Sequence, residues 1–165
     1  MIVPRSDSNP DTVITGVAGR KGFSSITIGK DRMNTEVGFG RKVLSVLEDF
    51  GVPFEHIPTG IDTMSVVVST ASIAGCRDAL VGRIFRDANA DSVTIDDSMA
   101  LIAIVGRGMV SNKGTAGRVF AAIANRDINI RMIDQGSGEN NIIVGVNEAD
   151  YTAALQAIYQ EFVPE

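Results

Sequence analysis

With 165 residues, 44% of them hydrophobic, the chain is long enough to bury one or two compact cores. Its formal net charge is −5 and its 15 basic residues are scattered, so the chain lacks the basic surface of a nucleic-acid-binding protein. It has a single cysteine and a single histidine, which excludes an internal disulfide and a structural zinc site. The longest apolar run, Met99 to Val105, is too short to span a bilayer and no signal segment opens the chain, so we expect a cytoplasmic protein without a membrane span.

The N-terminal part of the chain predicts a tail followed by an isolated strand. Residues 1–11 carry two prolines, two serines and two aspartates without periodicity, which is typical of a tail or the remnant of a linker. Residues 12–18 favour a β-strand. We interpret Gly19 to Gly22 as a basic turn.

Residues 24–95 predict one complete β-α-β-β-α-β unit. A strand at 24–28 leads through a helix entrance, Lys30 to Gly40, into a helix that ends at Phe50 with Gly51 as its C-cap. The remaining predicted elements are strands at 52–57 and 63–68 with a turn at 58–62 between them, a helix at 74–86 and a strand at 91–95.

The same pattern begins again 76 residues later, so that Gly114 repeats Gly38 without a gap. A fixed period of this kind indicates a structural repeat. In the second copy a strand at 101–105 is followed by a Gly-rich helix entrance, where Ser111 or Asn112 can accept a hydrogen bond from the amides of the first helical turn. The further predicted elements are a helix that carries residues 119–124, strands at 128–133 and 142–146, and a helix at 148–163.

The second copy lacks a fourth strand, because the chain ends after its second helix. An open edge at that place would expose backbone groups and core. Residues 12–18 are the only spare strand, so we predict that they close the second unit. The predicted fold is α+β, with two ferredoxin-like βαββαβ units, the first inserted into the second. The predicted ranges are 23–97 for the first unit and 12–19 with 98–165 for the second.

Both helix entrances carry specific motifs. The second copy contains V-G-R-G-M at 105–109 with Ser111 and Gly114, then I-N-I at 128–130, M-I at 132–133 and Q-G-S-G-E at 135–139. The first copy contains M-N at 33–34, E-V-G-F-G-R-K-V-L at 36–44 and G-I-D at 60–62. These motifs closely resemble the second and the first ACT domain of aspartokinases (aspartate kinases), and Thr12 to Gly19 resembles the segment that joins the kinase domain to them. One departure is Gly138, where the family usually has serine before Glu139.

The resemblance implies a regulatory region without its kinase domain. The sequence has no G-x-x-x-x-G-K-[ST] phosphate cradle, so we expect no catalytic residue, cofactor or metal site in this chain. ATP and Mg²⁺ would serve the full-length enzyme, which phosphorylates L-aspartate to 4-phospho-L-aspartate. The implied partners are an amino-acid effector, a kinase domain or catalytic subunit, and a second copy of the chain that pairs through the ACT domains. Nucleic acid and membranes are not expected as partners.

The residue types at the first helix entrance suit a free amino acid. The carboxylate of the amino acid would meet the backbone amides of Gly38, Phe39 and Gly40, because glycine has no side chain and lets a ligand approach the backbone closely. The ammonium groups of the amino acid would meet Glu55 and Asp62. The resemblance implies lysine or threonine as the effector, and two nearby carboxylates favour lysine. The predicted effector-binding residues are Met33, Glu36, Gly38, Phe39, Gly40, Phe54, Glu55, Thr59 and Asp62, with Met33, Phe39 and Phe54 as walls.

The second entrance is predicted to be chemically different from the first. It has Lys113 where the first has Val37, and Gln135 where the first has Thr59. It would serve either packing or a second effector. Its candidate residues are Met109, Ser111, Asn112, Gly114, Thr115, Ala116 and Gln135.

Plainer interpretations stay open. Gly38 and Gly114 can simply begin helices, and Asp62 can cap its turn without a ligand. At the level of function, the chain can also be a structural dimerisation module with empty pockets. A small ferredoxin-like enzyme is a further alternative, against which stands the lack of any motif that pairs Cys76 with His56 as nucleophile and base.

Overall fold

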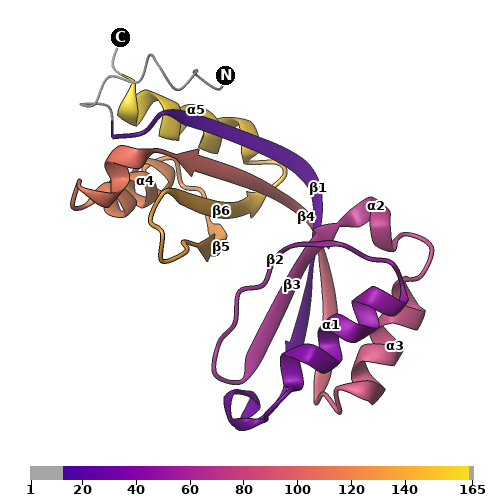
Figure 1. The fold of residues 1–165 in the computed structure, drawn as a ribbon. Helices are drawn as coiled ribbons and strands as arrows, with labels where there is room; N and C mark the ends of the chain where they lie inside the picture. Colours follow the sequence, from indigo (N-terminus) through magenta and orange to yellow (C-terminus); the bar gives the residue numbers. More distant parts are fainter. Residues whose placement is uncertain (1–12, 164–165) are drawn as a thin grey trace. The chain divides into compact units, whose positions relative to one another are not determined.

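The computed structural model describes residues 13–163 (Figure 1), so the predicted tail at 1–11 lies outside the described residues. The described chain divides into two compact units. We call residues 22–98 the inserted unit, and residues 13–21 together with 99–163 the split unit. The strands follow the order β2 (Phe54–His56), β3 (Thr63–Ser69), β1 (Gly16–Gly29), β4 (Ser92–Val105), β6 (Asn141–Asn147) and β5 (Ile130–Asp134). The predicted α+β fold, with one βαββαβ unit inserted into the other, is confirmed.

The described range contains helices on a mainly antiparallel framework of strands. None of these helices is long and apolar enough to cross a membrane. The strands are β1 (Gly16–Gly29), β2 (Phe54–His56), β3 (Thr63–Ser69), β4 (Ser92–Val105), β5 (Ile130–Asp134) and β6 (Asn141–Asn147). The helices are α1 (Phe39–Asp49), α2 (Thr70–Ile73), α3 (Arg77–Asp87), α4 (Thr115–Ala124) and α5 (Tyr151–Phe162), with 3-10 turns η1 (Met33–Thr35) and η2 (Arg107–Val110).

In the inserted unit, β3 lies between β1 and β2 and pairs antiparallel with both. Because successive side chains of a strand point to opposite faces, alternate residues of β1 such as Ile26 and Ile28 share one face. Helices α1 and α3 cover that face (Figure 1), and they bury apolar residues spaced three and four apart. The core includes Ile26, Ile28, Val43, Leu47, Val66, Val68, Leu80 and Ile84.

In the split unit, β6 lies between β4 and β5 and is antiparallel to both. Helices α4 and α5 contact each other and supply apolar residues to the same core. The repeat therefore builds the same layered arrangement twice. The core of the split unit includes Ala100, Ile102, Ile104, Val119, Ile123, Ile142, Val144, Val146 and Ile158.

The N-terminal segment of the described chain lies along β4 in the split unit. The Thr15 amide donates to the Val105 carbonyl at 2.7 Å, and the Thr15 hydroxyl donates to the same oxygen at 3.1 Å. Val13, Ile14 and Val17 pack against the core of this unit. Gly106 is in close contact with the segment, because a Cβ there would collide with the Val13 carbonyl and the backbone of Ile14.

Two strands are longer than the sequence patterns indicate. The predicted basic turn at 19–22 is wrong, because these residues lie within β1, and the predicted strands at 91–95 and 101–105 are both parts of β4. Gly19 serves close packing instead of a turn, since a Cβ there would lie 2.6 Å from the Tyr151 ring and 2.8 Å from the Leu101 carbonyl. Glycine in a strand commonly marks such a close approach.

Helix boundaries also differ from the predicted ones. The predicted helix at 74–86 begins only at Arg77, as α3, and a separate short helix that was not predicted, α2, lies before it, with Gly75 between the two. The predicted helix at 148–163 begins only at Tyr151. The patterns thus predict the existence of these helices better than their ends, where local hydrogen bonds decide.

Candidate functional site

The first entrance is the loop at 30–38 that leads from β1 into α1. Gly38 precedes the first residue of α1 and has a φ of 83°, in the left-handed region that favours glycine. No side chain caps this helix. The amides of its first turn therefore have no side-chain acceptor, and the positive end of the helix dipole lies behind them. An anionic group of a ligand is suited to such a place.

The apolar candidates of this entrance lie in two different environments. Met33 and Phe39 belong to the core of the inserted unit, with exposed fractions of 4% and 3%. Phe54, on the edge strand β2, is half exposed, and the neighbouring Glu55 is exposed. Thr59 donates its hydroxyl proton to the carbonyl of residue 57 at 3.1 Å. Met33 and Phe39 thus support the loop from within the core, whereas Phe54 and Glu55 are at the surface.

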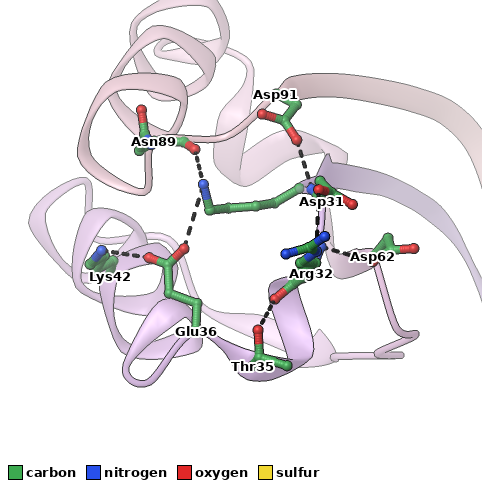
Figure 2. Close-up of polar contacts among 9 residues, drawn as sticks. Asp31, Arg32, Thr35, Glu36, Lys42, Asp62, Asn89 and Asp91 are labelled. Carbon is green, nitrogen blue, oxygen red and sulfur yellow. Dashed lines mark hydrogen bonds and ion pairs between the residues drawn. The ribbon is translucent and has the colours of Figure 1, made fainter.

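Charged groups surround Glu36 in this loop (Figure 2). One oxygen of the Glu36 carboxylate accepts a hydrogen bond from Lys42 Nζ at 2.7 Å, and the other lies 3.5 Å from Lys30 Nζ. Lys30 Nζ also donates to the Asn89 carbonyl at 2.7 Å. The hydrogen bond from Lys42, together with the charges of both lysines, holds the pKa of Glu36 below its usual range. Glu36 is therefore ionised at neutral pH, with both oxygens next to ammonium groups of the chain itself.

Asp62 holds the backbone of the same loop. Its Oδ1 accepts the Arg32 amide at 3.0 Å, and its carbonyl accepts the Lys30 amide at 2.9 Å. On another side of the loop, the Asp91 carboxylate accepts the Asp31 amide at 2.7 Å (Figure 2). The predicted residues Glu36 and Asp62 are thus brought to one loop, where each already has partners within the chain.

The sequence reasoning placed Lys30 in this entrance without naming it as a site residue, and it missed Asn89 and Asp91 as parts of the entrance. Asn89 has a φ of 49°, in a region where asparagine is enriched among non-glycine residues. The available signal was the run D-A-N-A-D at 87–91, which follows a helical pattern and contains the residue types of a helix end. Nothing in the sequence indicates that this turn meets the loop at 30–36.

The second entrance leads from β4 through η2 into α4. Gly114 precedes this helix with a φ of 87°. The predicted capping role of Ser111 or Asn112 is wrong, because no side chain caps α4. Asn112 Nδ2 donates to the Gly108 carbonyl at 2.8 Å, and the Thr115 hydroxyl donates to the Asn112 carbonyl at 2.9 Å. Since α4 begins only at Thr115, the side chains at 111 and 112 lie before the N-cap.

A pocket of about 220 Å³ lies at the second entrance. Its lining brings together a basic residue, Lys113, an acidic residue, Glu139, and the amide-bearing Gln135 with the first residues of α4. Of the seven predicted candidates only Ser111 is not part of the lining. Between residues 13 and 163 no group of three His, Cys, Asp or Glu side chains is placed to hold a metal ion. The lining residues are Met109, Val110, Asn112, Lys113, Gly114, Thr115, Ala116, Gln135 and Glu139.

Comparison with known proteins supplies the family. Residues 102–162 match the family model of the ACT domain. The chain is 41% identical over 162 residues to Aspartokinase 3 of Bacillus subtilis (strain 168), and this alignment covers 98% of the chain and 36% of that protein. The crystal structure of Clostridium acetobutylicum aspartate kinase is 47% identical, with a TM-score of 0.88 over 91% of this chain and 35% of that one. The ligand-free regulatory subunit of aspartate kinase from Thermus thermophilus is 26% identical, with a TM-score of 0.78 over 92% of this chain and 99% of that one.

This chain belongs to the ACT-domain regulatory regions of the aspartokinases. It spans about a third of the length of the whole aspartokinases that it matches, and nearly all of the separate Thermus thermophilus regulatory subunit. The resemblance that the entrance motifs predict is therefore confirmed. Within this aspartokinase regulatory region, the two entrances share a backbone design and differ in charge. In the first entrance Glu36 is paired with two lysines of the chain, whereas in the second Lys113 and Glu139 line a hollow.

Proposed function

We propose that this region senses a free amino acid and transmits its binding to an aspartokinase catalytic domain as feedback inhibition. The inhibited reaction is the ATP-dependent phosphorylation of L-aspartate to 4-phospho-L-aspartate, the first step of lysine, threonine and methionine biosynthesis. The effectors are lysine, threonine or both. The observation that carries the proposal is the mixed-charge pocket at the second entrance.

The chemistry of this pocket suits a zwitterion. The ligand's carboxylate has two complementary partners, the ammonium group of Lys113 and the amides at the beginning of α4. The ligand's ammonium group has acceptors in Glu139 and in the side-chain oxygen of Gln135. The volume of about 220 Å³ lies below the roughly 300–1,000 Å³ of pockets for drug-sized ligands, which agrees with a ligand of amino-acid size.

The first entrance is proposed as a further effector site with the same backbone design. The amides of Gly38 and Gly40 would receive the carboxylate, because Gly38 has a positive φ and no side chain caps α1, whereas the Phe39 amide donates to the Glu36 carbonyl at 3.3 Å. Asp62 and Glu55 would receive the ammonium groups. The remaining candidates there are Met33, Glu36, Phe54 and Thr59, as the sequence predicts.

An effector can inhibit only through its difference in affinity for the active and the inhibited arrangements of the enzyme. We propose that two copies of the region pair through their ACT domains, in the cytoplasm, and act on a kinase domain or a separate catalytic subunit. The likeness to a regulatory subunit from Thermus thermophilus, which is a chain of similar extent, supports this arrangement.

Calorimetric titration of the chain with L-lysine and L-threonine tests the proposal. We expect saturable heat and a raised melting temperature with at least one of them, and no effect from its D-enantiomer, which has the same charges and atoms. Amide NMR shifts at Gly38 and Gly114 would assign the binding to the first or the second entrance. No heat and no thermal shift with either L-amino acid would refute effector binding and favour a structural dimerisation module. Phosphoryl transfer from ATP to aspartate by this chain alone would instead favour the enzyme alternative.

A further inference from the structure

Lys30 contributes a fixed positive charge to the first entrance. Its side chain is only 13% exposed, and its Nζ donates to the Asn89 carbonyl at 2.7 Å. Asn89 follows the last residues of α3, where the helix dipole is negative and the carbonyls lack helical partners. A cation is stabilised at such a helix end, so the ammonium group of Lys30 is held in one place.

The negative charge of Glu36 does not cancel the cations around it. Glu36 lies between Lys30 and Lys42, with ion-pair distances of 3.5 Å and 2.7 Å, so these three groups carry one net positive charge. Asp62 and Asp91 bring negative charge to other sides of the loop, but both side chains are exposed and water screens them more strongly. The shielded charge of Lys30 therefore acts on a bound ligand with less screening.

We infer that Lys30 is a specificity-determining residue of the first entrance, which lowers the affinity for a diamino acid relative to an amino acid with a neutral side chain. The inference rests on the proposed function, since it presupposes that an amino acid binds at the beginning of α1. Lysine and threonine share the α-carboxylate and the α-ammonium group, and lysine carries one further positive charge. The repulsion from Lys30 acts on that difference, whichever residues contact the ligand directly.

The substitution Lys30→Met removes the charge and keeps most of the aliphatic stem. The 165-residue chain is titrated with L-lysine and with L-threonine. The readout is the NMR shift of the Gly38 amide, which reports binding at the first entrance only. We expect the ratio of the lysine Kd to the threonine Kd to fall about fivefold or more in Lys30→Met, because the repulsion from one partly shielded charge is removed. Lys30→Arg keeps the charge and should keep the ratio of the wild-type protein.

Arg83→Met is the matched control. It also removes one positive charge from the inserted unit, but Arg83 pairs with Asp49 and Asp87, and Asp49 is the last residue of α1, at the opposite end from the entrance. Its Kd ratio should equal that of the wild-type protein. If circular dichroism finds Lys30→Met unfolded, Lys30→Gln replaces it, because its amide can still donate to the Asn89 carbonyl.

The outcomes separate the inference from the function on which it rests. A Kd ratio that is unchanged or raised in the folded, uncharged variant overturns the role of Lys30, while binding of both amino acids to the wild-type protein would still support the proposed function. An equal fall in Arg83→Met would also overturn it, because the effect would then be one of net charge alone. A wild-type protein that binds neither amino acid overturns the proposed function and this inference together.

Discussion

The Ser24 hydroxyl donates a hydrogen bond to the Asp97 carboxylate at 2.6 Å and so joins β1 to β4 inside the inserted unit. Ser24 is fully buried, and Arg77, at the beginning of α3, donates to the other carboxylate oxygen at 2.7 Å. Because a hydroxyl has one proton, Thr70 is the donor in its 2.8 Å contact with Ser24. Two strands and the helices α2 and α3 thus meet in one hydrogen-bonded network.

The substitution Asp97→Ala should destabilise the chain. It removes the acceptor of a buried hydroxyl, which costs about 1–3 kcal/mol of unfolding free energy, whereas the ion pair with Arg77 adds little because both partners are partly exposed. Urea denaturation measures the loss. Asp97→Asn, which keeps an acceptor oxygen for Ser24, should lose less than Asp97→Ala. Equal stability of the Ala variant and the wild-type protein would contradict the role of this network.

Acid should weaken the inserted unit through the same carboxylate. The Arg77 guanidinium and the Ser24 hydroxyl hold the pKa of Asp97 below its ordinary value of 3.8. A carboxyl group whose pKa is lower in the folded state stabilises the fold above its unfolded pKa, and this stabilisation is lost as the pH falls through the folded pKa. We therefore expect the unfolding free energy to fall from about pH 5 downward. Urea midpoints of Asp97→Asn should fall less steeply over the same pH range, and parallel curves for the two proteins would exclude Asp97 as a source.

The substitution Gly106→Ala tests the contact between the N-terminal segment and the split unit. A Cβ at this position collides with the backbone of Val13 and Ile14, and overpacking of this kind costs about 1–3 kcal/mol. Gly117→Ala is the control in the same unit, because it lies within α4 and its Cβ would meet no atom within 4 Å. It should raise the unfolding free energy by about 0.5–1 kcal/mol. The same stability for both variants would argue against the close approach at Gly106.

Substitutions of Asp62 separate its structural role from a role in ligand binding. Asp62→Ala removes both the negative charge and the acceptor of the Arg32 amide, whereas Asp62→Asn removes only the charge. We expect both variants to bind the effector of the first entrance more weakly, the Ala variant by about 1–3 kcal/mol, because a charge-assisted contact is lost. Titration by NMR at Gly38 measures this. Wild-type affinity in Asp62→Asn would remove the charge of Asp62 from the site.

Lys113→Met should weaken effector binding at the second entrance about tenfold, because the ligand's carboxylate loses a charge-assisted partner. The readout is the titration curve of the Gly114 amide. Arg118→Met is a suitable control, because it removes a positive charge from the same helix at a residue whose partners are Glu161 and the Phe162 ring on α5. Equal weakening in both variants would show that the effect does not depend on the pocket.

Much of the fold could be predicted from local patterns, because neighbours in the sequence decide them. Strand alternation and helical spacing located the strands and helices, and the 76-residue shift revealed a duplicated unit. Gly51, predicted as the C-cap of α1, lies one residue after the C-cap Phe50 and has a φ of 65°. Gly38 and Gly114 lie before their helices for a similar local reason, because the backbone there has a positive φ that is unfavourable for residues with a side chain.

The sequence by itself determined most of the elements, their duplication and the helix entrances, whereas the tertiary structure decided the lengths of β1 and β4 and the partners of the charged groups. Gly19 lies in a strand at a place where Tyr151 approaches too closely for a Cβ. Lys30 meets Asn89, a residue 59 positions away, because the fold brings the end of α3 to the first entrance. Periodicity reports only interactions between near neighbours in the chain. Hydrogen bonds and ion pairs across the fold depend on which distant segments the packing of the core brings together.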